Sequence, residues 1–332
     1  MNGISILKAR VRAGFAVFAG CLLALLSGCA PLGQLVPQTW ELRSHWPQGV
    51  PQTVELTQVP FFPQDEFQCG PAALATVLAH TGVPITPEPL VSQVWLPSRQ
   101  GSLQVEMLAT PRRYNRISYV LAPSYADMLR EVAAGNPVLV LQDIGAVLTQ
   151  WHYAVINGFD YSSGTVFLRS GTQARQEMPF TAFERTWIKS RYWAMVTMPP
   201  DKIPATAAED AWMTAVLAMA RTGDGASITT AYETALRRWP DNLQAAIGLA
   251  NEHHSRGSLI TAAAILRRAL LARPKSVVLI NNLAQTLSDQ GRHGEALTLL
   301  GQADTNSPFG EEVRSTRELI EQRIEQQRSA LR

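Results

Sequence analysis

The stretch QDEFQCGPAAL, residues 64–74, contains Cys69, a residue type that can act as a nucleophile. Pro71 fits the first turn of a helix and an apolar run follows it, so we expect Cys69 at a helix N-terminus. Unpaired backbone N–H groups and the helix dipole favour a thiolate there, which predicts a lowered thiol pKa. The alternative is a structural cysteine, which would more naturally lie inside the helix on its apolar face.

A thiol nucleophile needs a general base, and His152 is the favoured candidate. It begins the run HYAVINGFD, whose composition predicts a strand. His80 lies on the same predicted helix as Cys69 and is therefore held about 16 Å from it, at about 1.5 Å per residue. His80 is much the poorer base for this reason.

These stretches resemble a known family, the papain-like cysteine peptidases related to the double-glycine leader peptidases of bacteriocin export. Gln64, the run CGPAAL and the later run HYAVINGFD occur in the order found in that family. The resemblance implies an α+β papain-like peptidase domain over residues 55–198, in which Cys69 attacks a carbonyl and His152 transfers the proton. It also implies that Gln64 donates to the oxyanion together with the backbone N–H of Cys69. Gln68 is the alternative donor.

The group that orients the histidine is where the sequence departs from the family, which has an Asp at the end of the following strand. Folding HYAVINGFDYSSGTVFLRSG as a hairpin brings Ser170 opposite the start of the His152 strand. A serine hydroxyl can fix the imidazole tautomer, but it supplies no charge to stabilise imidazolium. Asp143 is the reserve candidate, and Ser170 as a mere strand end is the alternative interpretation. Asp160 is about 26 Å from His152 along the strand, at about 3.3 Å per residue.

The elements that must position these residues are short and mixed over residues 55–198. Three apolar runs predict strands: NPVLVLQD, HYAVINGFD and GTVFLRSG. The stretches PAALATVLAH and YADMLREVAAG carry the apolar spacing of helices. The Pro- and Ala-rich residues 199–208 predict a linker, and only helices are predicted after it.

The helical part contains an internal repeat. Pro240, Pro274 and Pro308 recur every 34 residues, and glycines and alanines recur in the same register. This period resembles the tetratricopeptide repeat and implies an all-α tetratricopeptide solenoid of three repeats over residues 209–310. Each helix pair would bury its apolar face against its neighbours, and the polar residues 311–332 suit a capping helix.

Residues 1–29 predict export, because basic residues precede a short apolar stretch. That stretch ends in LSGC, which resembles the lipobox of bacterial lipoproteins and implies that Cys29 is lipidated and anchors the chain to a membrane. Cys21 would be removed with the leader. A signal without lipid, or a membrane anchor, is the alternative. The proline-rich composition of residues 30–54 predicts a tether. We expect the protein to be located at the outer membrane, facing the periplasm.

Composition narrows the range of partners. A formal net charge of +2 over 332 residues, without a basic stripe, argues against nucleic acid. We expect no metal or cofactor, because His253 and His254 are adjacent on a helix and no glycine-rich phosphate loop occurs. With Cys21 removed and Cys29 acylated, only Cys69 remains as a thiol, so no intramolecular disulfide is expected.

These features predict a lipid-anchored cysteine peptidase that cleaves a peptide or protein substrate through a thioester, with the repeats recruiting substrate or partner. The second hypothesis is a catalytically weak or inactive papain-like domain that acts with the repeats as a protein-binding or assembly factor. The serine at position 170 favours that second hypothesis. A third is acyl or amide transfer by the same Cys69 and His152 on a non-peptide substrate.

Overall fold

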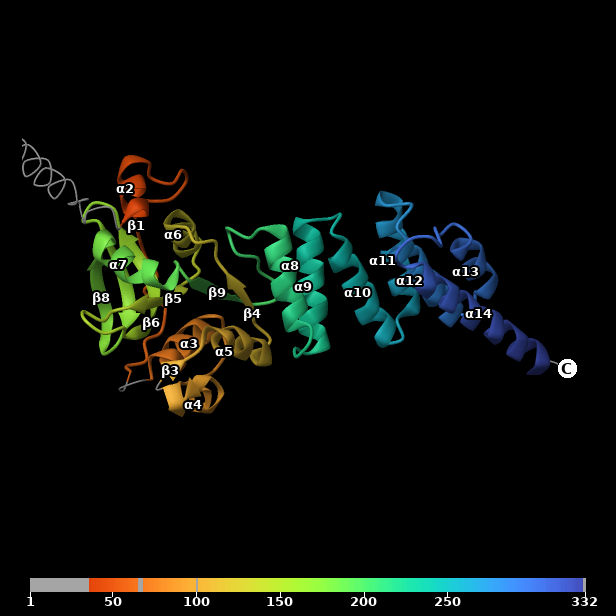
Figure 1. Cartoon of the computed structure of the whole chain (residues 1–332), viewed down its shortest axis with the longest axis horizontal. Coiled ribbons are helices and arrows are strands. Elements are labelled where there is room, and N and C mark those ends of the chain that lie inside the picture. Colours follow the sequence, from red (N-terminus) through yellow and green to blue (C-terminus); the bar gives the residue numbers. More distant parts are fainter. Residues whose placement is uncertain (1–35, 65–67, 100, 331–332) are drawn as a thin grey trace, which may run out of the picture.

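The structure, a computed structural model, describes residues 36–64, 68–99 and 101–330. Figure 1 shows a sheet domain, residues 36–198, from which a helical region, residues 209–330, extends as an elongated array. The predicted leader, with Cys21 and Cys29, lies outside the described residues. No described helix combines the length and the apolar character needed to span a membrane.

The sheet domain is built on an antiparallel sheet of seven strands, ordered β4-β9-β5-β6-β7-β8, with β1 also paired to β6. The strands are β1 (Thr53–Glu55), β4 (Ile117–Val120), β5 (Val138–Asp143), β6 (Trp151–Asp160), β7 (Thr165–Ser170), β8 (Gln173–Pro179) and β9 (Ala194–Met198). A separate two-stranded ladder joins β2 (Trp95–Leu96) to β3 (Gly101–Ser102).

Helices cover both faces of the sheet, because its central strands are apolar on both sides. One face carries α3 (Cys69–His80), α4 (Glu88–Val94) and α5 (Gln104–Ala109), and the other carries α2 (Pro37–Ser44), α6 (Tyr125–Ala133) and α7 (Phe180–Trp187) (Figure 1). Short 3-10 turns complete the domain at Pro97–Arg99, Thr110–Tyr114 and Ile188–Ser190. Side chains of β5 alternate between the two layers, with Leu139 and Leu141 packing on the α3 side and Val138 and Val140 on the other.

The segment before the sheet differs from the tether predicted for residues 30–54. From Val36 onward it is folded, and α2 buries Leu42 in the apolar core that α6 and α7 also line. The buried carboxylate of Glu184 on α7 accepts the backbone N–H groups of Gln38 and Thr39 at 3.0 and 2.7 Å. A negative charge at unpaired N–H groups stabilises the start of a helix. The partner is about 145 residues away in sequence, so local composition did not indicate this helix.

The helical region consists of seven helices within the described residues: α8 (Glu209–Met219), α9 (Gly225–Arg238), α10 (Leu243–Ser255), α11 (Leu259–Ala272), α12 (Val277–Asp289), α13 (His293–Leu300) and α14 (Gly310–Ala330). The starts of α8, α10 and α12 are 34 residues apart. Gly257 and Gly291, also 34 residues apart, have φ of +75° and +78° in the turns before α11 and α13. This left-handed backbone favours glycine, so turn geometry explains the glycine spacing.

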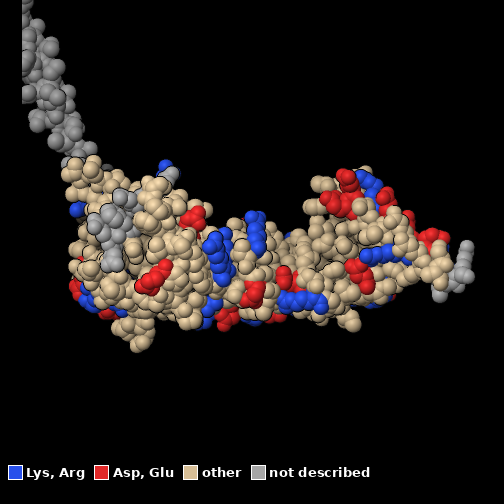
Figure 2. Space-filling view, turned by 90° about the horizontal axis from the view of Figure 1, so that it is seen from below, with Lys and Arg blue, Asp and Glu red and all other residues tan. Residues whose placement is uncertain are grey.

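One continuous apolar core joins the sheet domain to the helical region. Trp212 of α8 is fully buried and its ring lies 6.1 Å from that of Tyr119 on β4. The connecting residues 199–208, predicted to be a linker, are fixed by the buried carboxylate of Glu131, which accepts the backbone N–H of Thr206 at 2.7 Å. Figure 2 shows charges of both signs interspersed over the helices and sparser over the sheet domain on the same side.

Candidate active site

Cys69 is the first residue of α3, and its thiol lies against the sheet. The backbone N–H of Tyr153 on β6 donates to the sulfur, as do the N–H groups of Gly70 and Cys69 itself. Burial raises the pKa of the Cys69 thiol above its ordinary value, and these N–H groups offset only part of that effect. The predicted lowering of the pKa is therefore wrong, because desolvation outweighs the helix N-terminus.

The first turn of α3 is locked to its surroundings by a close contact at Gly70. A Cβ atom at this position would lie 2.1 Å from Ser102 Oγ on β3, so a glycine is required unless Ser102 moves. The Ser102 carbonyl in turn accepts the phenol O–H of Tyr153 at 3.2 Å. The sequence did not indicate that Ser102 and Tyr153 position the thiol, although Tyr153 directly follows His152. Together they hold the thiol beside the backbone of β6.

His152 lies at the start of β6 and is paired with Ser170 at the end of β7. Its Nε2 atom is 2.9 Å from Ser170 Oγ. Burial lowers the pKa of His152, which favours a neutral imidazole. With Nε2 engaged by the hydroxyl, Nδ1 is the nitrogen left for a thiol. Within the described part of the chain, no hydrogen bond joins His152 to Cys69.

Asp143, the reserve candidate for orienting His152, is bonded to groups other than that histidine. Its Oδ1 atom accepts the backbone N–H groups of Gly145 and Gln150 at 3.0 and 2.8 Å, and its Oδ2 lies 3.2 Å from Lys189 Nζ. Backbone N–H groups and Lys189 lower the pKa of this carboxyl group, although desolvation opposes them. Asp143 thus shapes the loop between β5 and β6, immediately before His152.

The two glutamines both precede α3 in the chain. The backbone N–H of Gln64 donates to the carbonyl of Gly171 at 3.1 Å, so Gln64 lies beside the residue that follows Ser170. Gln68 is the N-cap residue of α3 and accepts the N–H of Ala72 through its carbonyl at 3.3 Å, while its side chain makes no capping bond. Both side chains remain candidates for the oxyanion donor.

His80 and Asp160, which the sequence disfavoured as partners of Cys69 and His152, make contacts outside the candidate site. His80 is at the far end of α3, where its Nε2 contacts the carbonyl of Gly135 at 3.1 Å. Asp160 closes the turn between β6 and β7 by accepting the hydroxyls of Ser162 and Ser163. Among the described residues, no group of three or more His, Cys, Asp and Glu side chains is arranged to hold a metal ion.

Comparison with known families matches residues 56–195 to the Peptidase_C39 like family. These residues form a C39-peptidase-like domain. They include Cys69, His152 and Ser170, together with the α3 face of the sheet. The C39-like domain is followed by the helical region, which lies outside the matched range.

Solved structures similar to this chain include two that are described as peptidases. A structure described as a C39-like peptidase from Bacillus anthracis is 17% identical with a TM-score of 0.38, covering 46% of this chain and 100% of that chain. The peptidase domain of Streptococcus ComA, a bifunctional ABC transporter involved in quorum sensing, is 21% identical with a TM-score of 0.35, covering 43% and 99%. MamA from MSR-1 is 20% identical with a TM-score of 0.31, covering 38% and 72%. Among curated proteins, none matches this sequence significantly.

Proposed function

We propose that this protein is a cysteine peptidase in which Cys69 is the nucleophile and His152 the general base. One observation carries the proposal: within a C39-like domain, the Cys69 sulfur accepts the N–H of Tyr153, the residue that directly follows His152. The backbone next to His152 at the start of β6 therefore lies against the thiol at the start of α3, which supports pairing the two residues in one site.

The resting pair is neutral in this mechanism, because burial raises the pKa of Cys69 and lowers that of His152. Ser170 accepts the Nε2 proton of His152, which leaves the lone pair of Nδ1 to take the thiol proton as sulfur attacks the carbonyl. The resulting oxyanion is stabilised by the backbone N–H of Cys69 and by Gln64, with Gln68 as the alternative side-chain donor. Imidazolium then protonates the leaving amine, and a thioester remains.

Hydrolysis of the thioester completes the cycle. His152 removes a proton from water as the water attacks, and its imidazolium returns the proton to the thiolate when the acid leaves. Because Ser170 has no charge, imidazolium is less stabilised than it would be beside a carboxylate. We expect slow turnover near neutral pH for this reason.

We also propose that Cys29 carries a lipid that anchors the protein in the outer membrane, facing the periplasm, and that the helical region is a set of three tetratricopeptide repeats. The 34-residue spacing of α8, α10 and α12 supports the repeat assignment. The repeats would recruit a substrate or partner protein. Incorporation of a labelled fatty acid that is lost in Cys29→Ser would support the anchor, and incorporation that is unchanged would contradict it.

Thiol alkylation tests the catalytic proposal. The rate of reaction of Cys69 with iodoacetamide is measured from pH 5 to 10 in the full chain and in His152→Ala, alongside hydrolysis of a fluorogenic peptide mixture. We expect Cys69→Ala and His152→Ala to abolish hydrolysis, and His152→Ala to slow alkylation below the thiol pKa. An ordinary thiol profile that His152→Ala leaves unchanged would contradict the proposal.

A binding or assembly factor is the second candidate function. The raised pKa of Cys69 and the absence of a hydrogen bond from it to His152 among the described residues favour this candidate. It predicts that Cys69→Ala leaves the protein's role in the cell intact. The peptidase predicts loss of that role with Cys69→Ala.

A further inference from the structure

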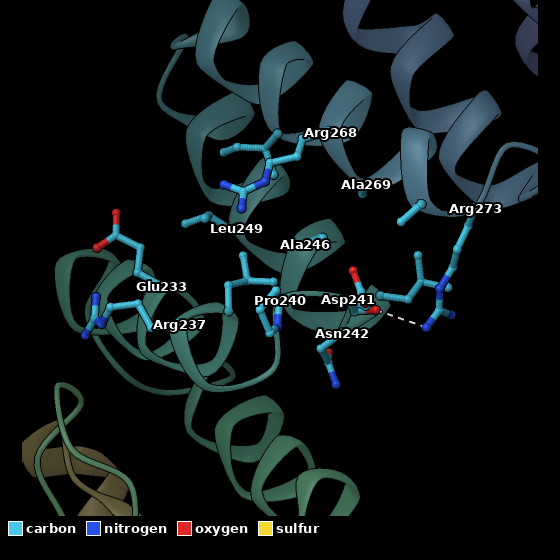
Figure 3. Close-up of a pocket in the computed structure, with 14 residues that line it drawn as sticks. Glu233, Arg237, Pro240, Asp241, Asn242, Ala246, Leu249, Arg268, Ala269 and Arg273 are labelled. Atoms are coloured by element: carbon cyan, nitrogen blue, oxygen red, sulfur yellow. Dashed lines mark hydrogen bonds between the residues drawn. The ribbon is translucent and has the colours of Figure 1, made fainter.

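A pocket of about 540 Å³ opens in the helical region, among residues that the peptidase proposal does not use. It lies between the C-terminal half of α9, the turn into α10, the first half of α10 and the second half of α11 (Figure 3). Its walls therefore come from two successive helix pairs, α8 with α9 and α10 with α11. A ligand in the pocket would contact both pairs at once.

The floor of the pocket is apolar, and small side chains leave it open. Ala246, Ala269 and Ala272 line it where longer side chains would occupy the space. Leu249 and Ile265 also line it, and Ile265 is only partly buried. An apolar group that enters the pocket would displace water from this surface, which is favourable.

Three guanidinium groups line the same pocket: Arg237 on α9, Arg268 on α11 and Arg273 directly after α11. None of them forms a salt bridge within residues 36–64, 68–99 and 101–330. Arg237 donates to Thr234 Oγ1 at 2.8 Å and Arg273 to the carbonyl of Asp241 at 3.0 Å. Each guanidinium carries five N–H donors, so most remain for a ligand.

Two carboxylates, Glu233 and Asp241, also line the pocket, so its side chains sum to one positive charge (three minus two). Figure 3 shows Glu233 and Arg237 at the outer edge on α9, whereas Arg268 reaches over the middle toward Leu249. The cation over the apolar floor is therefore Arg268. Within the described residues, neither Glu233 nor Asp241 forms a salt bridge with Arg268, so the N–H donors of Arg268 are available to a ligand.

We propose that this pocket binds an acidic segment of a partner protein, with an apolar side chain on the floor and a carboxylate on Arg268. Guanidinium groups bind carboxylates through paired N–H donors, and the spread of the arginines around the rim suits more than one acidic residue. The proposal deepens the proposed recruitment of a partner protein by the helical region, on which it rests, and does not depend on peptide-bond cleavage.

Fluorescence anisotropy tests the proposal with the full chain carrying Cys69→Ala, so that cleavage cannot consume the probe. The probe is a labelled ten-residue peptide with one Leu flanked by Glu residues, and the comparison peptide has Gln in place of Glu. We expect saturable binding of the Glu peptide that weakens with salt, and at least tenfold weaker binding of the Gln peptide.

Arg268→Gln and Arg267→Gln form a matched pair of variants. Arg267 is the next residue on α11, is exposed and acts electrostatically on Glu295 of α13 instead of lining the pocket. We expect Arg268→Gln to weaken binding of the Glu peptide at least tenfold and Arg267→Gln to change it less than twofold, with both variants melting at the wild-type temperature. No saturable binding, or equal losses in the two variants, would overturn the proposal.

Discussion

Replacing Ser170 with Asp would place a carboxylate beside His152, whose Nε2 atom lies 2.9 Å from the serine hydroxyl. An opposite charge at this range raises an imidazole pKa by about 1 to 3 units, or about 1.4 to 4 kcal/mol in favour of imidazolium. Coulomb's law gives a similar upper value, about 4 kcal/mol for charges about 4 Å apart at an effective dielectric constant of about 20. Imidazolium would in turn stabilise the Cys69 thiolate.

The assay is the pH dependence of Cys69 alkylation, with peptide hydrolysis measured in parallel. In the native protein we expect the thiolate to form only above the ordinary thiol pKa, because burial raises the pKa of Cys69. In Ser170→Asp we expect alkylation to begin at least one pH unit lower and hydrolysis at pH 7 to rise about tenfold. The control is Ser170→Asn, because an Asn side chain has nearly the same shape as Asp but carries no charge. Identical profiles for the two variants would refute the electrostatic reasoning.

Three further predictions concern stability. Gly70→Ala forces a Cβ against Ser102 Oγ and should destabilise the fold by about 1 to 3 kcal/mol in urea unfolding; failure of Ser102→Gly to restore stability would disprove the clash. Glu184→Gln weakens the bonds to the start of α2 and should cost about 1.5 to 3 kcal/mol, while the same change at exposed Glu177 should cost much less. Burial lowers the pKa of His152, so the unfolded chain binds the proton first and stability should fall as pH drops below about 6.5. Melting between pH 7.5 and 5 should change less in His152→Gln, and an unchanged pH dependence would contradict this.

Local patterns were sufficient to predict the elements that position the candidate site. Pro71 and the apolar run after it indicated a helix beginning near Cys69, and α3 begins at that residue. The lengths of two apolar runs indicated a hairpin that returns Ser170 to the start of the His152 strand, where their hydrogen bond is found. The 34-residue spacing matched the starts of α8, α10 and α12. The first two signals came from residues close together in sequence, and the third came from a spacing that recurs along the chain.

What the sequence could not supply depends on contacts between distant segments. The charge state of Cys69 is set by its burial against Tyr153, which is known only once α3 packs on β6. Helix α2 is held by Glu184, far along the chain, so the proline-rich composition of residues 30–54 was misleading there. The arginine-lined pocket arises from helices of two successive pairs, and no local pattern of charge indicated it.

The shared core at Trp212 and Tyr119 has a mechanical consequence. Because α8 shares the core of the C39-like domain and Glu131 holds the connecting residues, swinging the first helix pair away from the sheet would expose that core to water. A protein segment held on the helices would then reach Cys69 only at a set separation along its own length. If the protein is the peptidase proposed above, this fixed separation would determine which bond of a bound protein segment Cys69 cleaves.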